Sequence, residues 1–240
     1  MKKYIVFIKT LLLIAFIVFL YGFASQRNKA KKIDKVAVTF ENGDNLFITY
    51  ETVNKLLIQN YKDIKSQPKE NIFLKQLEET LLSNKMIANA EVFLSVNGEL
   101  GAIIKQKTPI ARVNQNGHTY YIDSKGNKMP LSTNYSARVP IVKGIREGKI
   151  PNELYTLAKL VFEDEFLKKL IVSIEQTPKK EFLFKTRVGG QTVELGKLDQ
   201  LDKKIKKLKV FYHKALNDKT LNTYKKINLM YNNQVVCTKN

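Results

Sequence analysis

The stretch from Thr108 to Gly144 reads TPIARVNQNGHTYYIDSKGNKMPLSTNYSARVPIVKG. Short apolar and aromatic runs alternate in it with turn residues, notably Asn116-Gly117 and the segment from Asp123 to Gly126. Runs of this kind, separated by glycine-containing turns, predict short strands joined by tight hairpins. The stretch contains no catalytic constellation, so it predicts architecture and not chemistry.

The preceding stretch, residues 33–106, predicts the element order strand, helix, helix, strand, strand. Thr49 is placed to cap the first helix, which its apolar spacing extends to Tyr61, and Asn71 is placed to cap the second. Asn97-Gly98, between two apolar runs, predicts a hairpin between the last two strands. Two helices packed on a three-stranded sheet would satisfy this order.

The stretch after Gly144 predicts a β-rich domain with two long helices. One helix is expected over residues 150–169, and the other around an apolar stripe from Leu198 to Ala215. Short strands fill the sequence between them. A last strand is expected over Lys226 to Cys237, with Met230 directed outward and with one face buried, formed by Ile227, Leu229 and Tyr231.

The N-terminal region contains an apolar run from Tyr4 to Ala24, interrupted only by Lys9 and Thr10. Its length matches the ~20 residues that a helix needs to cross the hydrocarbon core of a bilayer. A cleavable signal peptide is the alternative, because Gly22 and Ala24 have the spacing of a signal peptidase site. We favour a retained anchor, because the whole run is long enough to span.

The charges beside this run leave its orientation open. The amino side carries Lys2, Lys3 and Lys9, and the carboxyl side carries five cations: Arg27, Lys29, Lys31, Lys32 and Lys35. Counted alone, these charges favour a cytoplasmic location for the carboxyl side. Long following domains, however, are translocated largely regardless of flanking charge.

The composition is strongly basic: 41 Lys and Arg against 22 Asp and Glu give a net charge of +19 in 240 residues. Such a charge suits an anionic membrane, a polyanionic polymer or nucleic acid. The lysines from Lys203 to Lys209 surround an apolar stripe without an aromatic stacking platform, so we expect a packed helix and no nucleic-acid contact. One cysteine, Cys237, excludes an internal disulfide, and with only His118 and His213 it gives no support for a zinc site.

No arrangement of residues predicts catalysis. Glu163, Asp164 and Glu165 are adjacent on a predicted helix and therefore point in different directions, which indicates a solvated face. Asp123 suits the first position of a turn, where its side chain bonds the backbone ahead. The spacing of a phosphate-binding loop is absent around Gly189. We therefore expect no enzyme, no cofactor and no small-molecule substrate.

The order of these motifs resembles the bacterial cell-division family FtsQ/DivIB. The resemblance rests on the strand "PIA" at 109–111, the aromatic strand ending in Asp123, the close "PIVKG" at 140–144, "VELG" at 193–196 with the lysine-rich helix after it, and "INLMYNNQVV" at 227–236. Residues 33–106, which precede all of these motifs, resemble a POTRA module. The resemblance implies an α+β chain with a cytoplasmic stub and transmembrane anchor over 1–25, a linker over 26–32, a POTRA domain (βααββ) over 33–107 and an FtsQ-type β domain over 108–240.

The family resemblance also implies a function. Such a chain is a bitopic scaffold of the divisome, held in the inner membrane by residues 4–24 and enriched at the septum, with its N-terminus in the cytoplasm and its bulk outside. Its partners are other bitopic division proteins of the FtsB, FtsL or FtsK kind. The alternative is a POTRA-containing component of secretion or outer-membrane assembly, but such proteins place POTRA modules before a long β-barrel, whereas the later strands here lie among two long helices.

The resemblance places the binding site on the last strand, which in the family receives a partner segment by strand addition. A strand at a sheet edge offers unpaired backbone groups for this purpose. The residues expected to contact the partner are Tyr224, Asn228, Met230, Tyr231, Asn233 and Val235. A weaker contact with division partners is expected on the POTRA module at Ile48, Thr49, Glu51 and Val53.

Overall fold

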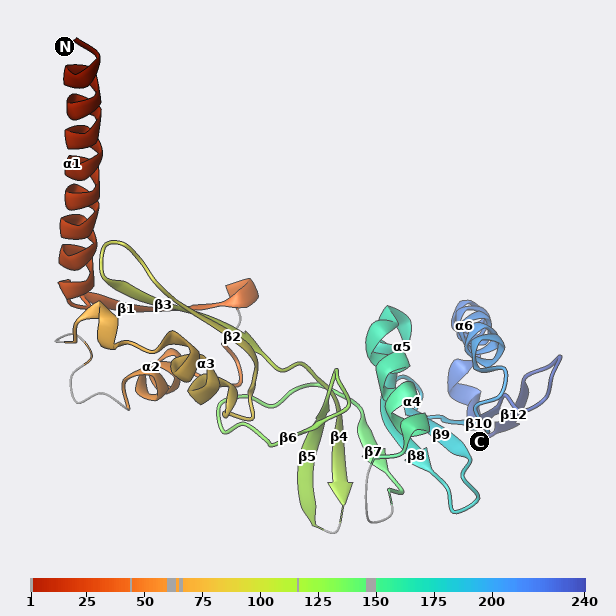
Figure 1. Cartoon of the computed structure of the whole chain (residues 1–240). Coiled ribbons are helices and arrows are strands. Elements are labelled where there is room, and N and C mark those ends of the chain that lie inside the picture. The colour runs from red at the N-terminus through yellow and green to blue at the C-terminus, as the bar shows by residue number, and fades with distance from the viewer. Residues whose placement is uncertain (1, 44, 60–63, 65–66, 116, 146–149) are drawn as a thin grey trace. The chain divides into compact units, whose positions relative to one another are not determined.

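The computed structural model describes residues 2–240 except 44, 60–63, 65–66, 116 and 146–149. The chain divides into two compact units, one ending at Gln106 and the other beginning at Lys107, and each has its own buried core. Figure 1 shows an N-terminal helix, a small sheet with helices and a larger β-rich sheet domain with helices. The predicted α+β class is confirmed.

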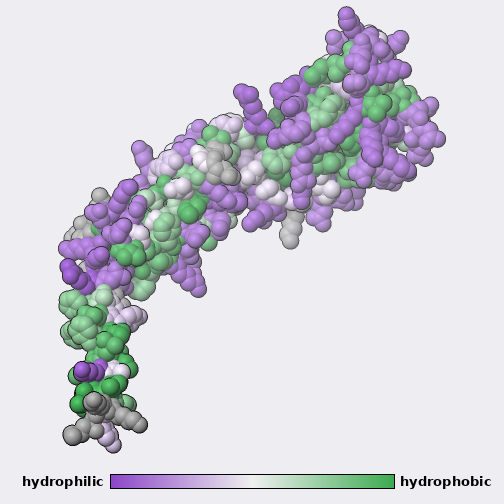
Figure 2. Space-filling model, turned by 90° about the horizontal axis from the view of Figure 1, so that it is seen from above, coloured by the Kyte–Doolittle hydropathy of each residue, from purple (hydrophilic) through white to green (hydrophobic). Residues whose placement is uncertain are grey.

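The N-terminal helix, α1 (Lys2–Ala30), contains the one segment among the described residues, Tyr4–Asn28, that is long and apolar enough to cross a membrane. Its surface is mostly hydrophobic, whereas the β-rich unit presents a mostly hydrophilic one (Figure 2). By length and composition a signal sequence would pass the same test. The helix continues through Gln26 to Ala30, where the sequence predicts a linker, because that stretch contains neither Gly nor Pro to end it.

The first unit contains a three-stranded sheet in the order β1-β3-β2, formed by β1 (Lys35–Phe40), β2 (Ile87–Leu94) and β3 (Glu99–Gln106). β1 is parallel to β3 and β2 is antiparallel to it. The helices α2 (Tyr50–Ile58) and α3 (Leu74–Leu82) contribute buried leucines to the same core as the sheet (Figure 1). This is the predicted module.

The helix starts in this unit agree with the prediction in one case of two. Thr49 caps α2, since its hydroxyl accepts a hydrogen bond from the Thr52 amide at 3.2 Å. Asn71 does not cap α3. It ends a 3₁₀ turn, η3 (Lys69–Asn71), because the buried Ile72 holds the backbone extended before α3 begins. α2 ends at Ile58, and the predicted extension to Tyr61 falls outside the described residues.

The second unit contains a nine-stranded sheet in the order β12-β11-β10-β9-β8-β7-β4-β5-β6. Its strands are β4 (Pro109–Gln115), β5 (His118–Asp123), β6 (Lys128–Met129), β7 (Ile141–Lys143), β8 (Ile171–Gln176), β9 (Phe182–Thr186), β10 (Thr192–Gly196), β11 (Tyr224–Asn228) and β12 (Val236–Lys239). The hairpins predicted over 108–144 are present as β4-β5 and β5-β6. Asp123 holds the second turn as expected, because its carboxylate accepts hydrogen bonds from the Lys125 and Asn127 amides at 2.9 and 2.8 Å.

The helices of this unit are α4 (Asn152–Glu163), α5 (Glu165–Leu170) and α6 (Leu201–Asn217), and their apolar sides complete the core. The single helix predicted over 150–169 is divided at Asp164. The Asp164 carboxylate accepts hydrogen bonds from the Phe166 and Leu167 amides, both at 3.0 Å, and so caps α5. In α6 the predicted stripe is confirmed, with Tyr212 fully buried and Phe211 half-buried.

Asp164 also forms an ion pair with Lys209 of α6, so it is not the solvated residue that the sequence predicts. Its flanking neighbours, Glu163 and Glu165, do face solvent, with side chains 61% and 74% exposed. Partial burial alone would raise the pKa of Asp164, but the Lys209 ammonium and the two amide donors outweigh it and lower the pKa below its ordinary value.

We expect Asp164→Ala to lower the free energy of unfolding by about 1–2 kcal/mol through loss of the cap. Asp164→Asn keeps a capping group but loses the charge, so its deficit should appear only where the carboxylate is ionised. Because the folded state has the lower pKa, the charge stabilises the fold fully above about pH 5, and this contribution is lost as the pH falls below about 4. Denaturant unfolding of the detergent-solubilised chain, measured at a series of pH values from above pH 5 to below pH 4, tests both effects.

The matched controls are Glu163→Ala and Glu165→Ala, which remove carboxylates that pair only within their own helix, at 3.8 and 3.7 Å. Each should change the unfolding free energy by no more than about 0.5 kcal/mol. Equal losses at all three positions would contradict the capping role of Asp164.

Candidate partner-binding edge

The sheet of the second unit ends at β6 on one side and at β12 on the other. β6 has two residues, whereas β12 has four and pairs only with β11. The outer backbone groups of β12 therefore have no partner within the sheet. An edge of this kind can accept an additional strand.

The last strand predicted over Lys226 to Cys237 is in fact a hairpin. β11 runs parallel to β10, the chain then turns over residues 229–235, and β12 returns antiparallel to β11 with Ile227 opposite Cys237. The edge strand is consequently β12, and the residues predicted in mid-strand lie in the connection. We call residues 229–235 the β11-β12 loop.

The side chain of Asn228 ends β11. Its amide oxygen accepts a hydrogen bond from the Met230 amide at 2.9 Å, which is a turn geometry that competes with a continuing strand. Its amide nitrogen donates to Glu194 of β10 at 2.9 Å, and the same carboxylate accepts from Lys226 at 2.9 Å. The Leu229 amide donates to the backbone oxygen of Glu194 at 2.9 Å. The start of the loop is thereby held on β10.

A lysine from α6 holds the middle of the loop. The Lys207 ammonium donates to the backbone oxygens of Leu229 at 3.1 Å and Tyr231 at 2.5 Å. Burial and, after it, the charge of Lys204 lower the pKa of Lys207. Neither Lys207 nor Glu194 is predictable as a site residue from the sequence, because a lysine-rich helix and a strand glutamate do not show in the sequence which carbonyls and amides they contact.

The structure separates the six residues predicted for strand addition into two groups. Tyr224 and Asn228 belong to β11, and they are engaged by the Phe211 ring and by Glu194 respectively. Met230, Tyr231 and Asn233 are exposed in the β11-β12 loop, while Val235 packs partly on the core. Tyr231 was expected to face the core, but its side chain is 50% exposed because the loop leaves the sheet.

Exposed side chains occur both in the β11-β12 loop and on β12, which follows it in the chain. Met230 is 45% exposed and rests on Gly196, where an added Cβ would lie 2.8 Å from the Met230 Cγ and Sδ atoms. Val236, at the start of β12, is 39% exposed, and Thr238 is also exposed. We call four exposed residues of the loop and of β12 the edge patch: Met230, Tyr231, Val236 and Thr238.

We predict that Lys207→Met loosens the β11-β12 loop, because the variant keeps the aliphatic stem but leaves two carbonyls without their ammonium donor. Loss of a charged hydrogen bond of about 1.5 kcal/mol should speed hydrogen exchange in peptides covering 229–235 by about tenfold. Mass spectrometry of exchange on the full chain measures it. Lys206→Met is the control, because the Lys206 side chain is exposed and its ammonium forms no hydrogen bond or ion pair within the described part of the chain. Equal acceleration in the Lys206 variant would refute the role of the Lys207 hydrogen bonds.

The contact residues expected on the first unit are only partly available. Ile48 and Val53 are 3% and 0% exposed and belong to the core, so they are not surface contacts. Thr49 is engaged as the cap of α2, and Glu51 is exposed. The sheet edge at β2 is also partly occupied, because the Glu78 carboxylate accepts a hydrogen bond from the Val92 amide at 2.9 Å.

Among the described residues, no group of three or more His, Cys, Asp or Glu side chains could hold a metal ion. Cys237 is half-buried in β12, and burial raises the pKa of its thiol, which disfavours the reactive thiolate.

Comparison with known families gives one match in each of the two units of the chain. A family model described as FtsQ/DivIB, C-terminal related, matches residues 108–238, and a POTRA-like domain model matches residues 32–105. No curated protein matches the chain. Members of the FtsQ/DivIB-related family are generally non-catalytic structural proteins. With more than half of its length matched, the chain belongs to the FtsQ/DivIB C-terminal-related family and carries a POTRA-like domain in front of it, which makes it a relative of bacterial division proteins.

Proposed function

We propose that this chain is a membrane-anchored scaffold of the bacterial division machinery, which binds other bitopic division proteins outside the cytoplasm. In this proposal α1 is retained in the inner membrane with its N-terminus in the cytoplasm, residues 33–107 form the POTRA module and residues 108–240 form the partner-binding domain. The FtsB-, FtsL- or FtsK-like partners that the family implies would meet it at the septum.

The observation that carries the proposal is the free outer side of β12 beside the edge patch. Added backbone hydrogen bonds would supply affinity, and the exposed side chains of Met230 and Tyr231 would supply specificity. The hydrogen bonds from Lys207 and the contacts of Glu194 hold this surface in place before a partner arrives. The conformational entropy that is lost on binding is therefore smaller. A scaffold of this kind needs no catalytic residue.

We expect Met230→Glu to weaken capture of the division partner by about 30-fold or more, because a buried charge at the centre of an interface costs at least ~2 kcal/mol. Pull-down from membranes with the full chain as bait measures it. A photocrosslinking side chain at Thr238 should capture the same partner in growing cells, whereas one at Asn222, outside the edge strand, should not.

The matched control is Val188→Glu. Val188 lies in the β9-β10 connection and is 46% exposed, nearly the same as Met230 at 45%. It should leave capture unchanged. Retained capture by a folded Met230→Glu variant removes the edge patch as the site. Depletion of the protein discriminates against the alternative function, because filamentous cells indicate division, while loss of outer-membrane proteins indicates secretion or assembly.

A further inference from the structure

Lys69 joins the end of α1 to the β2-β3 turn. Its ammonium donates to the backbone oxygens of Ser95 at 2.8 Å and Val96 at 2.7 Å, and it lies 3.5 Å from the side-chain oxygen of Asn28. Asn28 is the last residue of the apolar span. The turn from Ser95 to Gly98 is therefore held beside the carboxyl end of that span.

The backbone reinforces this connection. The Lys69 amide donates to the Lys31 oxygen at 3.0 Å, and the Ile33 amide donates to the Gln67 oxygen at 3.2 Å. The Asp34 amide donates to the Gly98 oxygen at 2.9 Å. The residues that follow α1 are thus bonded into the POTRA-like unit and do not form a free linker.

The length of the span fixes the depth of this region in a membrane. The segment Tyr4–Asn28 has 25 residues. At 1.5 Å per residue a helix of that length is about 37 Å long, whereas the hydrocarbon core is about 30 Å thick. Asn28 then lies among the lipid headgroups, and so does the turn that Lys69 holds against it.

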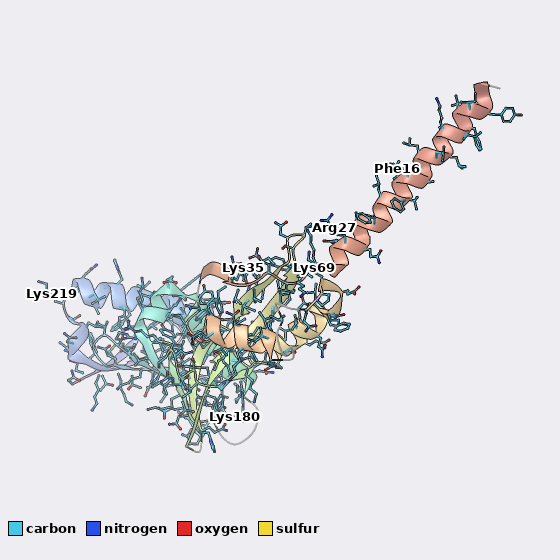
Figure 3. The ribbon with its side chains drawn as sticks, turned by 90° about the vertical axis from the view of Figure 1, so that its left-hand side faces the viewer. Phe16, Arg27, Lys35, Lys69, Lys180 and Lys219 are labelled. Carbon is cyan, nitrogen blue, oxygen red and sulfur yellow. The ribbon has the colours of Figure 1, made fainter. Side chains whose placement is uncertain are left out.

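The side chains around this point suit an anionic headgroup layer. Figure 3 shows Arg27, Lys35 and Lys69 around the carboxyl end of α1. Five cations (Arg27, Lys31, Lys32, Lys35, Lys69) stand here against three acids (Asp34, Glu70, Glu99), a net charge of +2 among these side chains. Of the acids, Glu99 is 3.7 Å from Lys35, and their side chains are 42% and 71% exposed.

The turn also carries an apolar residue that the folded unit does not use. Val96 is 74% exposed, more than any other large apolar side chain outside α1 in the described residues. An exposed valine at a hairpin tip is costly in water but favourable in the acyl-headgroup boundary. It adds an apolar contact to the charge attraction.

We propose that Arg27, Lys31, Lys32 and Lys35, together with the β2-β3 turn, form a membrane-contacting surface that binds anionic phospholipid headgroups and holds the POTRA-like unit against the bilayer. This inference rests on the proposed retention of α1 in the membrane. A basic cluster of this size next to a span is of the kind that attracts anionic lipids. The surface would limit rotation of the POTRA-like unit relative to the membrane plane.

The test uses the full chain in liposomes. Asn97→Cys, in a Cys237→Ser background, places one fluorophore on the exposed turn, and lipids spin-labelled at the headgroup act as the quencher. We expect clearly stronger quenching in membranes with about one quarter phosphatidylglycerol than in pure phosphatidylcholine. The difference should disappear in about 1 M NaCl, where the Debye length is only about 3 Å.

Replacing Lys31, Lys32 and Lys35 by Gln should abolish the phosphatidylglycerol dependence. The matched control replaces Lys55 of α2, Lys75 of α3 and Lys85 of the α3-β2 turn by Gln, which removes as many exposed charges from the same unit and should retain the dependence. Quenching that is independent of phosphatidylglycerol, or lost equally in both triple variants, overturns the inference. Two further measurements separate failure of this inference from failure of the proposed function. Partner capture through Met230 is measured on its own, and the mass of the mature chain reports whether α1 is retained.

Discussion

A buried amide holds the carboxyl-terminal part of the fold together, because its polar atoms must be hydrogen-bonded inside the protein. Gln191 is fully buried, and its side-chain oxygen accepts from the hydroxyls of Thr186 at 3.0 Å and Tyr212 at 2.8 Å. Its side-chain nitrogen donates to the Leu221 oxygen at 3.0 Å. These partners belong to β9, α6 and the turn η4 (Leu221–Thr223) that leads into β11. Burial raises the pKa of Tyr212 to about 12, so the phenol stays protonated at physiological pH. The position of α6, and with it the place where β11 and β12 enter the sheet, depends on this cluster.

Once α6 is in place, its lysines act as directed donors. Lys204 is 5% exposed, and its ammonium donates to the Lys197 oxygen at 2.7 Å and to Asp199 at 3.0 Å. Lys207 holds the β11-β12 loop, and Lys209 holds the cap of α5. Three of the five lysines between 203 and 209 therefore fasten neighbouring segments. This accounts for a basic helix without invoking a polyanion, and it shows that part of the net positive charge belongs to the interior architecture.

Local signals in the sequence predicted most elements, and long-range side-chain bonds account for the errors. The hairpins over 108–144 were predictable because each turn carries its own signal, such as Gly126 at a φ of +83° with Asp123 before it. The alternation of Ile227, Leu229 and Tyr231 continues past the end of β11, so a period-two pattern alone predicts one strand where the Asn228 side chain makes a turn. Asp164 does not disturb the helical spacing of the apolar residues around it. The spacing therefore predicts one continuous helix, although Asp164 caps the start of a second one. Of the predicted contact residues, Ile48 and Val53 proved to be core, because a motif carried over from a family specifies position in the chain and not burial.

The cations beside α1 show why a charge count and the proposed orientation disagree. The count treats flanking lysines as free to choose a side of the membrane. Here the backbone of Lys31 and Asp34 is hydrogen-bonded into the POTRA-like unit, so these residues must lie on the side where that unit folds. A long domain is translocated largely regardless of flanking charge, and the basic segment that belongs to it is carried across with it. In the proposed orientation the cations thus reach the outer headgroups because they are part of the folded unit, and a positive flank outside the cytoplasm becomes a consequence of the fold.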